Sequence, residues 1–67
     1  MTSGEKMRSL RGKKSKRKVS EELGISFSSY AKYERNERIP RDDVKIKIAK
    51  YFRSSVQDIF FGQAEHK

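Results

Sequence analysis

The 67-residue sequence predicts an all-α fold, a compact bundle of five short helices, and three observations lead to this prediction. Apolar residues recur three and four positions apart, as they do on one face of a helix. Serines suited to helix N-caps alternate with Gly, Asn and Pro residues that end helices. No sustained run of β-branched residues alternates between turn signals, as strands would require. We expect residues 1–67 to form one domain with an ordered core over about 4–62.

Capping and stop signals set the expected helix boundaries. The helices are expected over about 4–11, 16–23, 27–35, 42–52 and from 56 onward. The expected N-caps are Ser15, Ser26 and Ser55, and the expected stops are Gly12, Gly24, Asn36 and Pro40. Asp58 is expected to complete a capping box with Ser55, while Asp42 and Asp43 suit the N-terminal dipole of their helix. Residues 1–3 and 63–67 are expected to fray.

One apolar stripe per helix predicts the core. Its expected members are Met7, Leu10, Val19, Leu23, Ile25, Tyr30, Tyr33, Val44, Ile48, Tyr51 and Phe52. Val44, Ile48, Tyr51 and Phe52 follow the i, i+4, i+7, i+8 spacing of a helix face. Ile25 is expected to fill the turn after Gly24.

Basic residues are concentrated in the first part of the chain. The formal net charge is +8, and residues 1–41 hold twelve of the 17 Lys and Arg but only five of the nine acids. This asymmetry favours a polyanionic partner, although a solvated basic surface is the alternative.

Several function classes are excluded or disfavoured by composition. The chain has no Cys, its one histidine is His66, and no Gly-rich phosphate loop precedes a helix. We therefore expect no enzyme activity, no metal site, no cofactor and no small-molecule ligand. No apolar run approaches the roughly 20 residues that span a bilayer, so we expect no membrane partner. The absence of Cys and of a secretory signal fits a cytoplasmic location, expected to be nucleoid-associated if the partner is DNA.

The strongest local signal is VSEELGIS, residues 19–26. Two short helices joined by a tight turn that contains Gly form the helix-turn-helix arrangement, here expected over about 15–35. Proteins that never contact DNA also contain such corners. Lys16, Arg17 and Lys18 add information because they occupy the first helical turn, where the macrodipole disfavours cations. A helix N-terminus with added positive charge suits phosphate, and neutral drift on an exposed surface is the alternative.

The outward face of the helix over 27–35 is suited to reading a DNA groove. The expected base-reading residues are Phe27, Ser28, Ala31 and Lys32. Ser28 and Lys32 offer hydrogen bonds to base edges, and Phe27 or Ala31 offers an apolar contact to a thymine methyl. Alternatively, Phe27 packs back onto the domain.

The stretch from Leu10 to Phe61 resembles the Cro/lambda-repressor type, or XRE-like, helix-turn-helix family of small prokaryotic and phage transcriptional regulators. The matching text is LRGKKS, VSEELGIS, YAKYERNERIPRDDVKIKIAKYF and VQDIFF. The resemblance implies a lambda-repressor-like fold of five helices, residues 27–35 as recognition helix, and a dimer on a double-stranded DNA operator. It makes a repressor the expected role.

Residue roles carry over by position within this resemblance. Lys16 lies where the family often has a glutamine that contacts phosphate and braces the recognition helix. With the cationic helix start, the expected phosphate contacts are Lys16, Arg17, Lys18, Ser26, Arg38 and Arg41. Arg11 and Glu34 match the family's internal ion pair, which is structural. Ser20 departs from the usual alanine and is expected to bond back to the carbonyl four residues earlier.

Two further readings of the chain stay open. The Ile59-Phe60-Phe61 cluster exceeds the needs of a small core, so it suits a homodimer interface or an antitoxin-like module that acts through a partner protein. RNA binding is disfavoured because most aromatic residues follow core spacing. The DNA-binding interpretation requires residues 16–18 and 27–32 to share one surface, and it fails if they face opposite sides.

Overall fold

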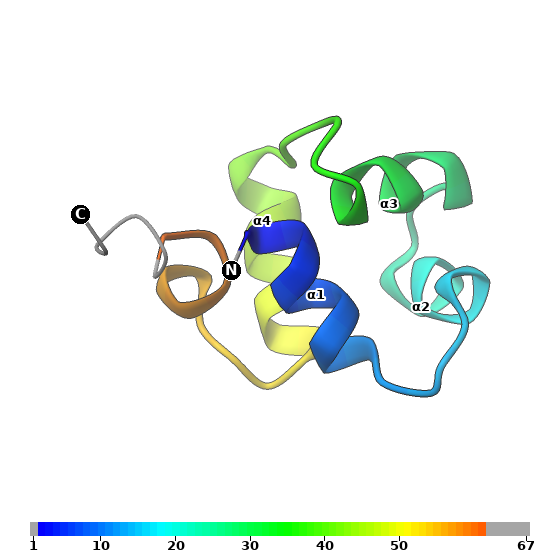
Figure 1. Ribbon diagram of the computed structural model, residues 1–67, viewed down its shortest axis with the longest axis horizontal. Helices are drawn as coiled ribbons and strands as arrows, with labels where there is room; N and C mark the ends of the chain where they lie inside the picture. Colours follow the sequence, from blue (N-terminus) through cyan, green and yellow to red (C-terminus); the bar gives the residue numbers. More distant parts are fainter. Residues whose placement is uncertain (1, 62–67) are drawn as a thin grey trace.

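Five helices follow one another in the computed structural model, which describes residues 2–61. They are α1 (Ser3–Arg11), α2 (Lys16–Leu23), α3 (Phe27–Glu34), α4 (Asp42–Tyr51) and the π-helix η1 (Gln57–Phe61). No strand occurs between residues 2 and 61, which confirms the all-α prediction. Figure 1 shows α2 and α3 together at one end of the molecule, and α1 in front of α4 in its middle.

Local capping explains where the helices begin and end. Ser15 and Ser26 cap α2 and α3 by accepting the backbone N–H of Lys18 and Ser29 at 3.0 and 3.1 Å. Gly12, with φ 60°, ends α1, and Asn36, with φ 63°, follows α3. These positions agree with the sequence-based boundaries.

The N-terminus of α1 is better ordered than expected. Thr2 accepts the backbone N–H of Glu5 at 3.2 Å, and the Glu5 carboxylate accepts the N–H of Thr2 at 2.9 Å. This reciprocal capping box makes the expected fraying wrong for Thr2 and Ser3. Met1 lies outside the described residues, as do residue 62 at the expected end of the core and residues 63–67.

The core lies where the four α-helices and η1 meet. Its fully buried apolar side chains are Met7, Val19, Tyr30, Ile48 and Ile59. Leu10, expected beside Met7, is instead 36% exposed. Three residues along an α-helix rotate a side chain to about 60° from the starting direction, so Leu10 lies at the edge of the buried face.

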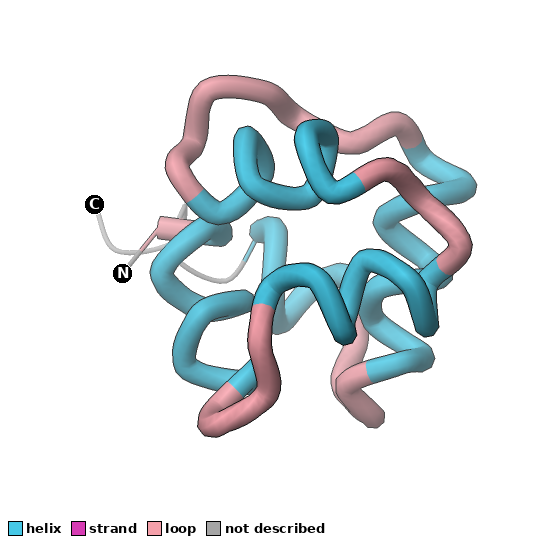
Figure 2. Tube along the Cα trace, turned by 90° about the vertical axis from the view of Figure 1, so that its right-hand side faces the viewer, coloured by secondary structure: helices cyan, strands magenta, loops and turns pink. Residues whose placement is uncertain are grey.

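The helices α1 and α2 both pack against α3, η1 packs against α1, and α2 also contacts α4. Figure 2 shows the same helices from the side, with loops at the periphery. Because α1 and α2 cover the inner side of α3, the opposite side of α3 is left on the surface.

A close backbone approach joins the N-terminus of α1 to the segment that follows α3. A Cβ on Gly4 would lie 2.3 Å from the carbonyl oxygen of Glu34, so this contact requires glycine. The N–H of Gly4 donates to Asn36 Oδ1 at 3.1 Å, and Asn36 Nδ2 donates to Thr2 Oγ1 at 3.0 Å. These contacts fix the start of the loop between α3 and α4.

The last helix differs in type from the expected α-helix. Ser55 accepts the N–H of Asp58 at 3.0 Å, as its expected capping role requires. The Asp58 carboxylate, however, accepts the Ser54 hydroxyl at 3.2 Å and lies 3.6 Å from Lys6 Nζ. The ion pair with Lys6 of α1 is a tertiary contact that accompanies the wider π-helical turn of η1, and the sequence pattern does not indicate that turn.

Candidate nucleic-acid interface

The corner between α2 and α3 has the backbone that the sequence predicts. Gly24 adopts the left-handed conformation, φ 75° and ψ 28°, and its N–H donates to carbonyls at the end of α2. The N–H of Ile25 donates to the carbonyl of Ser20 at 3.0 Å. Ile25 is half-buried and packs against the core, as expected for the residue that fills the turn.

The starts of α2 and α3 lie on one surface. The guanidinium carbon of Arg17 lies 4.8 Å from the centre of the Phe27 ring. Arg17 belongs to the first turn of α2, and Phe27 is the first residue of α3. Arg17 and Phe27 therefore lie on the same side of the molecule, as the DNA-binding interpretation requires of these two residues.

Three of the four expected base-reading residues lie at the surface of α3. Phe27 is 40% exposed, Ser28 is exposed and Lys32 is partly exposed. Ala31 is the correction, because it is only 5% exposed and its methyl group is covered inside the domain. Ala31 lies between Tyr30 and Lys32 in the sequence. Because α1 and α2 both pack against α3, the buried face of α3 is wide enough to include Ala31.

The charged residues at the start of α2 differ in how far they are neutralised. Lys18 Nζ lies 3.6 Å from the Glu22 carboxylate, which also pairs with Lys14 at 3.3 Å. A hydrogen bond from the Tyr51 hydroxyl and one from Lys14 lower the pKa of Glu22, so this carboxylate stays charged. Lys16 and Arg17 have no carboxylate partner among residues 2–61.

Arg17, and not Lys16, contacts the start of α3 in the described part of the chain. Lys16 makes no hydrogen bond or ion pair within the described part of the chain, whereas Arg17 stacks on Phe27.

Ser20 packs in the interior at 2% exposure, and its hydroxyl donates to the carbonyl of Arg17 at 2.8 Å. This bond spans three residues, where the sequence analysis expected four.

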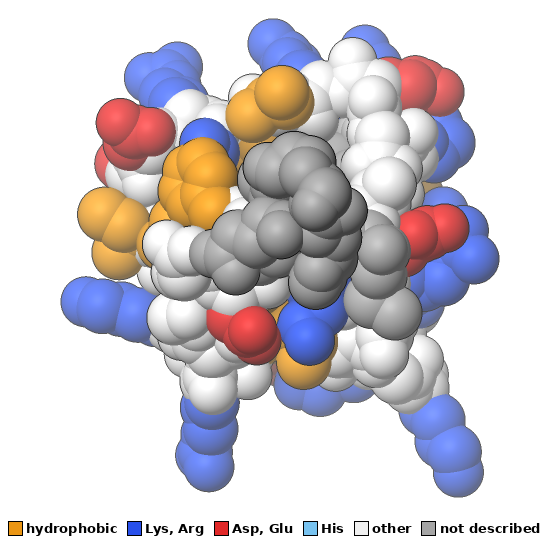
Figure 3. Space-filling model, turned by 60° about the vertical axis from the view of Figure 1, so that its left-hand side comes forward, with side chains coloured by type: hydrophobic (Ala, Val, Ile, Leu, Met, Phe, Trp, Pro, Cys, Tyr) orange, Lys and Arg blue, Asp and Glu red, His pale blue; other side chains and the backbone are white. Residues whose placement is uncertain are grey.

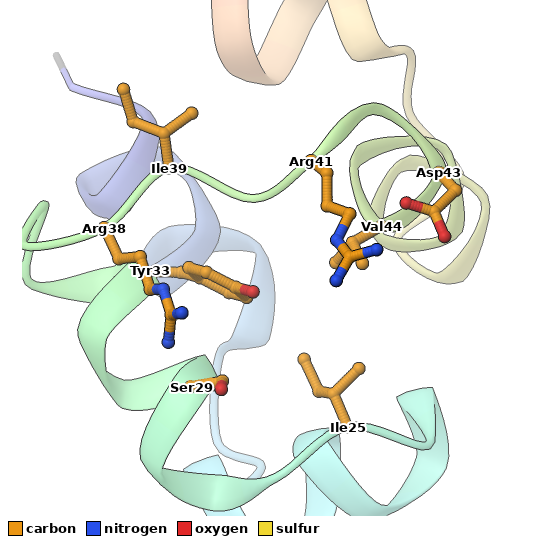
Figure 4. Close-up of a pocket in the computed structure, with 8 residues that line it drawn as sticks. All are labelled: Ile25, Ser29, Tyr33, Arg38, Ile39, Arg41, Asp43 and Val44. Atoms are coloured by element: carbon orange, nitrogen blue, oxygen red, sulfur yellow. The ribbon is translucent and has the colours of Figure 1, made fainter.

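A hollow of about 530 Å³ lies between the start of α3, the α3–α4 loop and the start of α4. Figure 4 shows Arg38 and Arg41 extending from the loop into this space, while Ile39 points away from it. Ser29 and Tyr33, one helical turn apart on α3, line the opposite wall. Neither guanidinium group forms an ion pair with a carboxylate among residues 2–61. Asp43 also lines the hollow, so its two arginines outnumber its one acidic side chain.

Sequence reasoning found the two arginines of this hollow but not its hydroxyl groups. Tyr33 is 8% exposed and was assigned to the core, yet Figure 4 shows its ring reaching toward the hollow. Ser26, expected as a phosphate contact, is exposed and accepts the N–H of Ser29, which leaves its own hydroxyl proton free to donate. The spacing of Ser29 and Tyr33 by four residues was the available signal.

The expected internal ion pair is present beneath this surface. Arg11 Nε and Nη2 donate to the two carboxylate oxygens of Glu34 at 2.7 and 3.1 Å, and the Tyr30 hydroxyl donates to the same carboxylate at 2.6 Å. Glu34 is 3% exposed. Burial and the neighbouring carboxylate raise the pKa of Tyr30, so its phenol stays protonated. The pair joins α1 to α3, and the Glu34 carboxylate is buried within it.

Apolar side chains reach the surface at the other end of the molecule. Ile46 and Phe61 are 49% and 45% exposed, and with Val56 they line a hollow of about 420 Å³. Figure 3 shows apolar side chains between Lys and Arg side chains on this side. Ile59, by contrast, is fully buried, and Phe60 packs against the core.

Within residues 2–61, no group of three His, Cys, Asp or Glu side chains is placed to hold a metal ion. His66 lies outside the described residues. No helix in the described range has the length and apolar character needed to cross a bilayer.

The comparisons with known proteins agree with the geometry of the corner. A family model described as helix-turn-helix matches residues 6–59. No curated protein and no solved structure matches the chain. The matched range runs from α1 into η1, so the match covers the fold as well as the corner.

Proposed function

Since this chain belongs to the helix-turn-helix family of DNA-binding regulators, in the XRE-like and lambda-repressor-like group, we propose that it is a sequence-specific repressor that reads double-stranded DNA. The observation that best supports this proposal is the contact between Arg17 and Phe27, which joins the cationic start of α2 to the exposed start of α3. In this proposal α3 enters the major groove and its first residues meet base edges.

Phosphate contacts surround the reading helix in this proposal. Lys16 and Lys18 on one side and Arg38 and Arg41 on the other flank α3 with positive charge. Lys18 contributes less than Lys16, because it already pairs with Glu22. Two flanking groups of cations match two stretches of backbone on either side of one groove.

Repression is proposed because a domain seated in the major groove excludes other proteins from the same site. A location in the cytoplasm on the nucleoid follows from the proposed DNA partner. A reporter gene placed under the control of a DNA sequence that the protein binds tests for repression. Repression lowers the expression of the reporter when the protein is produced.

A homodimer is proposed through the apolar surface formed by Ile46, Val56 and Phe61. Two copies that share a two-fold axis would read two half-sites about 34 Å apart. Phe61→Ser is expected to shift the protein toward the monomer in sedimentation experiments and to weaken binding to a two-half-site duplex more than to one half-site. A monomeric wild type would instead favour a different partner protein on this surface.

The first test is selection of bound duplexes from a random library, followed by a salt titration. A dimer with four cationic phosphate contacts in each copy predicts that affinity falls by roughly 10³ or more between 50 and 200 mM salt. A flat salt response together with no enriched sequence would overturn DNA binding and favour the partner-binding alternative.

The second test separates base reading from phosphate contact. Lys32→Ala is expected to relax base preference by about 1–3 kcal/mol at one or two positions, while Lys16→Ala weakens all duplexes alike. Binding of each variant to the selected duplex and to its single-base variants measures this difference. Identical behaviour of the two variants would contradict the assigned roles.

A further inference from the structure

We propose that Arg17 and Phe27 act as one reading unit that recognises a guanine next to a thymine, so that Arg17 contacts a base rather than phosphate. The inference rests on the proposed function and names part of its DNA target. It replaces the role that the sequence pattern suggested for Arg17.

Arg17 is restrained by its contact with the ring of Phe27. Its guanidinium carbon lies 4.8 Å from the centre of the Phe27 ring, within the range of a cation–π contact. No carboxylate among residues 2–61 pairs with this guanidinium, and no hydrogen bond engages it. The planar group is therefore held by the ring alone, with its N–H donors left for a ligand.

The ring of Phe27 lies at the exposed start of α3. Phe27 is the first residue of α3 and is 40% exposed, so the core does not absorb it. The N-terminal residues of a recognition helix are those that contact base edges. A guanidinium stacked on this ring is carried to the depth of the bases, whereas Lys16, without such a contact, is left to extend toward the backbone.

The two side chains match chemical groups that the major groove of DNA presents. The arginine fork matches the O6 and N7 acceptors of guanine, and this is the most frequent specific contact in the major groove. The part of the Phe27 ring that Arg17 leaves uncovered is apolar, and the apolar group that the major groove offers is the thymine methyl. Two neighbouring base pairs are thus read by two side chains from different helices.

The experiment uses the full chain and a duplex selected from a random library, with single-atom base substitutions. Replacing the contacted guanine by 7-deazaguanine removes N7, and replacing the neighbouring thymine by uracil removes the methyl group. The proposal predicts that the first change lowers wild-type affinity by about 5- to 150-fold and the second by a smaller factor.

Matched variants assign these losses to the two side chains. Arg17→Met keeps a long side chain but has no N–H donor, so it should bind guanine and 7-deazaguanine duplexes equally. Phe27→Leu removes the ring and should reduce both preferences. Arg8→Met on the exposed side of α1 is the matched control and should retain both. Thermal unfolding checks that all three variants fold.

The outcomes separate this inference from the function on which it rests. Failure of the wild type to select any sequence would overturn both. Normal selection by the wild type, with the guanine preference intact in Arg17→Met, would overturn the reading unit alone and return Arg17 to the phosphate contacts.

Discussion

Two regions of this molecule use the same basic residue types for opposite purposes. Beneath the surface, Arg11 is held by the buried Glu34 carboxylate, with Nε 2.7 Å from one of its oxygens. At the surface, Lys16, Arg17, Arg38 and Arg41 have no carboxylate partner among residues 2–61. The first region joins helices, and the second is left with free charge.

The two regions differ in the free energy of a cation that has no carboxylate partner. A buried charge needs its counter-ion because the interior solvates it poorly. An exposed charge is solvated by water and remains free to release counter-ions when a polyanion binds. Substitutions in the first region should therefore change stability, and those in the second should change binding.

The largest expected effect comes from breaking the buried pair. Arg11→Ala leaves the Glu34 carboxylate without its cation and should lower the free energy of unfolding by about 3–5 kcal/mol. Urea denaturation followed by circular dichroism measures the loss. Arg8→Ala on the same helix is the matched control, and its effect should stay within about 0.5 kcal/mol. Equal effects of the two variants would remove the distinction between the regions.

A smaller loss is expected from Tyr30→Phe, which removes one hydrogen bond to the same carboxylate. Bonds to charged groups contribute about 1.5–3 kcal/mol, so the variant should unfold at lower urea concentration at pH 7. The pKa of Tyr30 is raised in the folded protein by burial and by the Glu34 carboxylate. Its protonation therefore stabilises the fold fully below the unfolded pKa of about 10, and this contribution is lost as pH rises above that value.

Unfolding midpoints between pH 9 and 11 measure this contribution. Tyr30→Phe should lose less stability than the wild type over that range. An alkaline loss in Tyr30→Phe as large as that of the wild type would show that another group causes it.

The smallest effect on stability is expected to have the opposite sign. The first turn of α2 contains no acidic residue, so its three cations face the positive end of the helix dipole. Lys16→Glu should raise the free energy of unfolding by about 0.3–1 kcal/mol. The same variant should weaken binding to every duplex. A variant that loses stability and binding together would place Lys16 in the structural region instead.

Much of the fold follows from local sequence. Ser15, Gly24 and Ser26 place the boundaries of α2 and α3 at the predicted residues, because capping bonds span only three or four positions. The pair of Arg11 and Glu34 was also expected, but only through family resemblance, since the two residues lie far apart in the chain.

The errors share a common origin in packing between helices. Ala31 and Leu10 were placed on the wrong side of their helix faces, and both sit at the edge of a buried stripe. The π-helical form of η1 and the hydroxyl of Tyr33 at the hollow depend equally on neighbouring elements. A pattern of apolar residues gives the direction of a face, but the neighbouring helices decide how wide the buried face is.

Local sequence and composition are enough to predict the four α-helices, the caps at Ser15 and Ser26, the turn at Gly24 and the concentration of positive charge, because each depends on residues a few positions apart or on residue counts. Packing between helices sets which cations are neutralised and which side chains meet, because these contacts join residues far apart in the chain. The stacking of Arg17 on Phe27 is the clearest case, since it depends on the angle at which two helix starts approach each other.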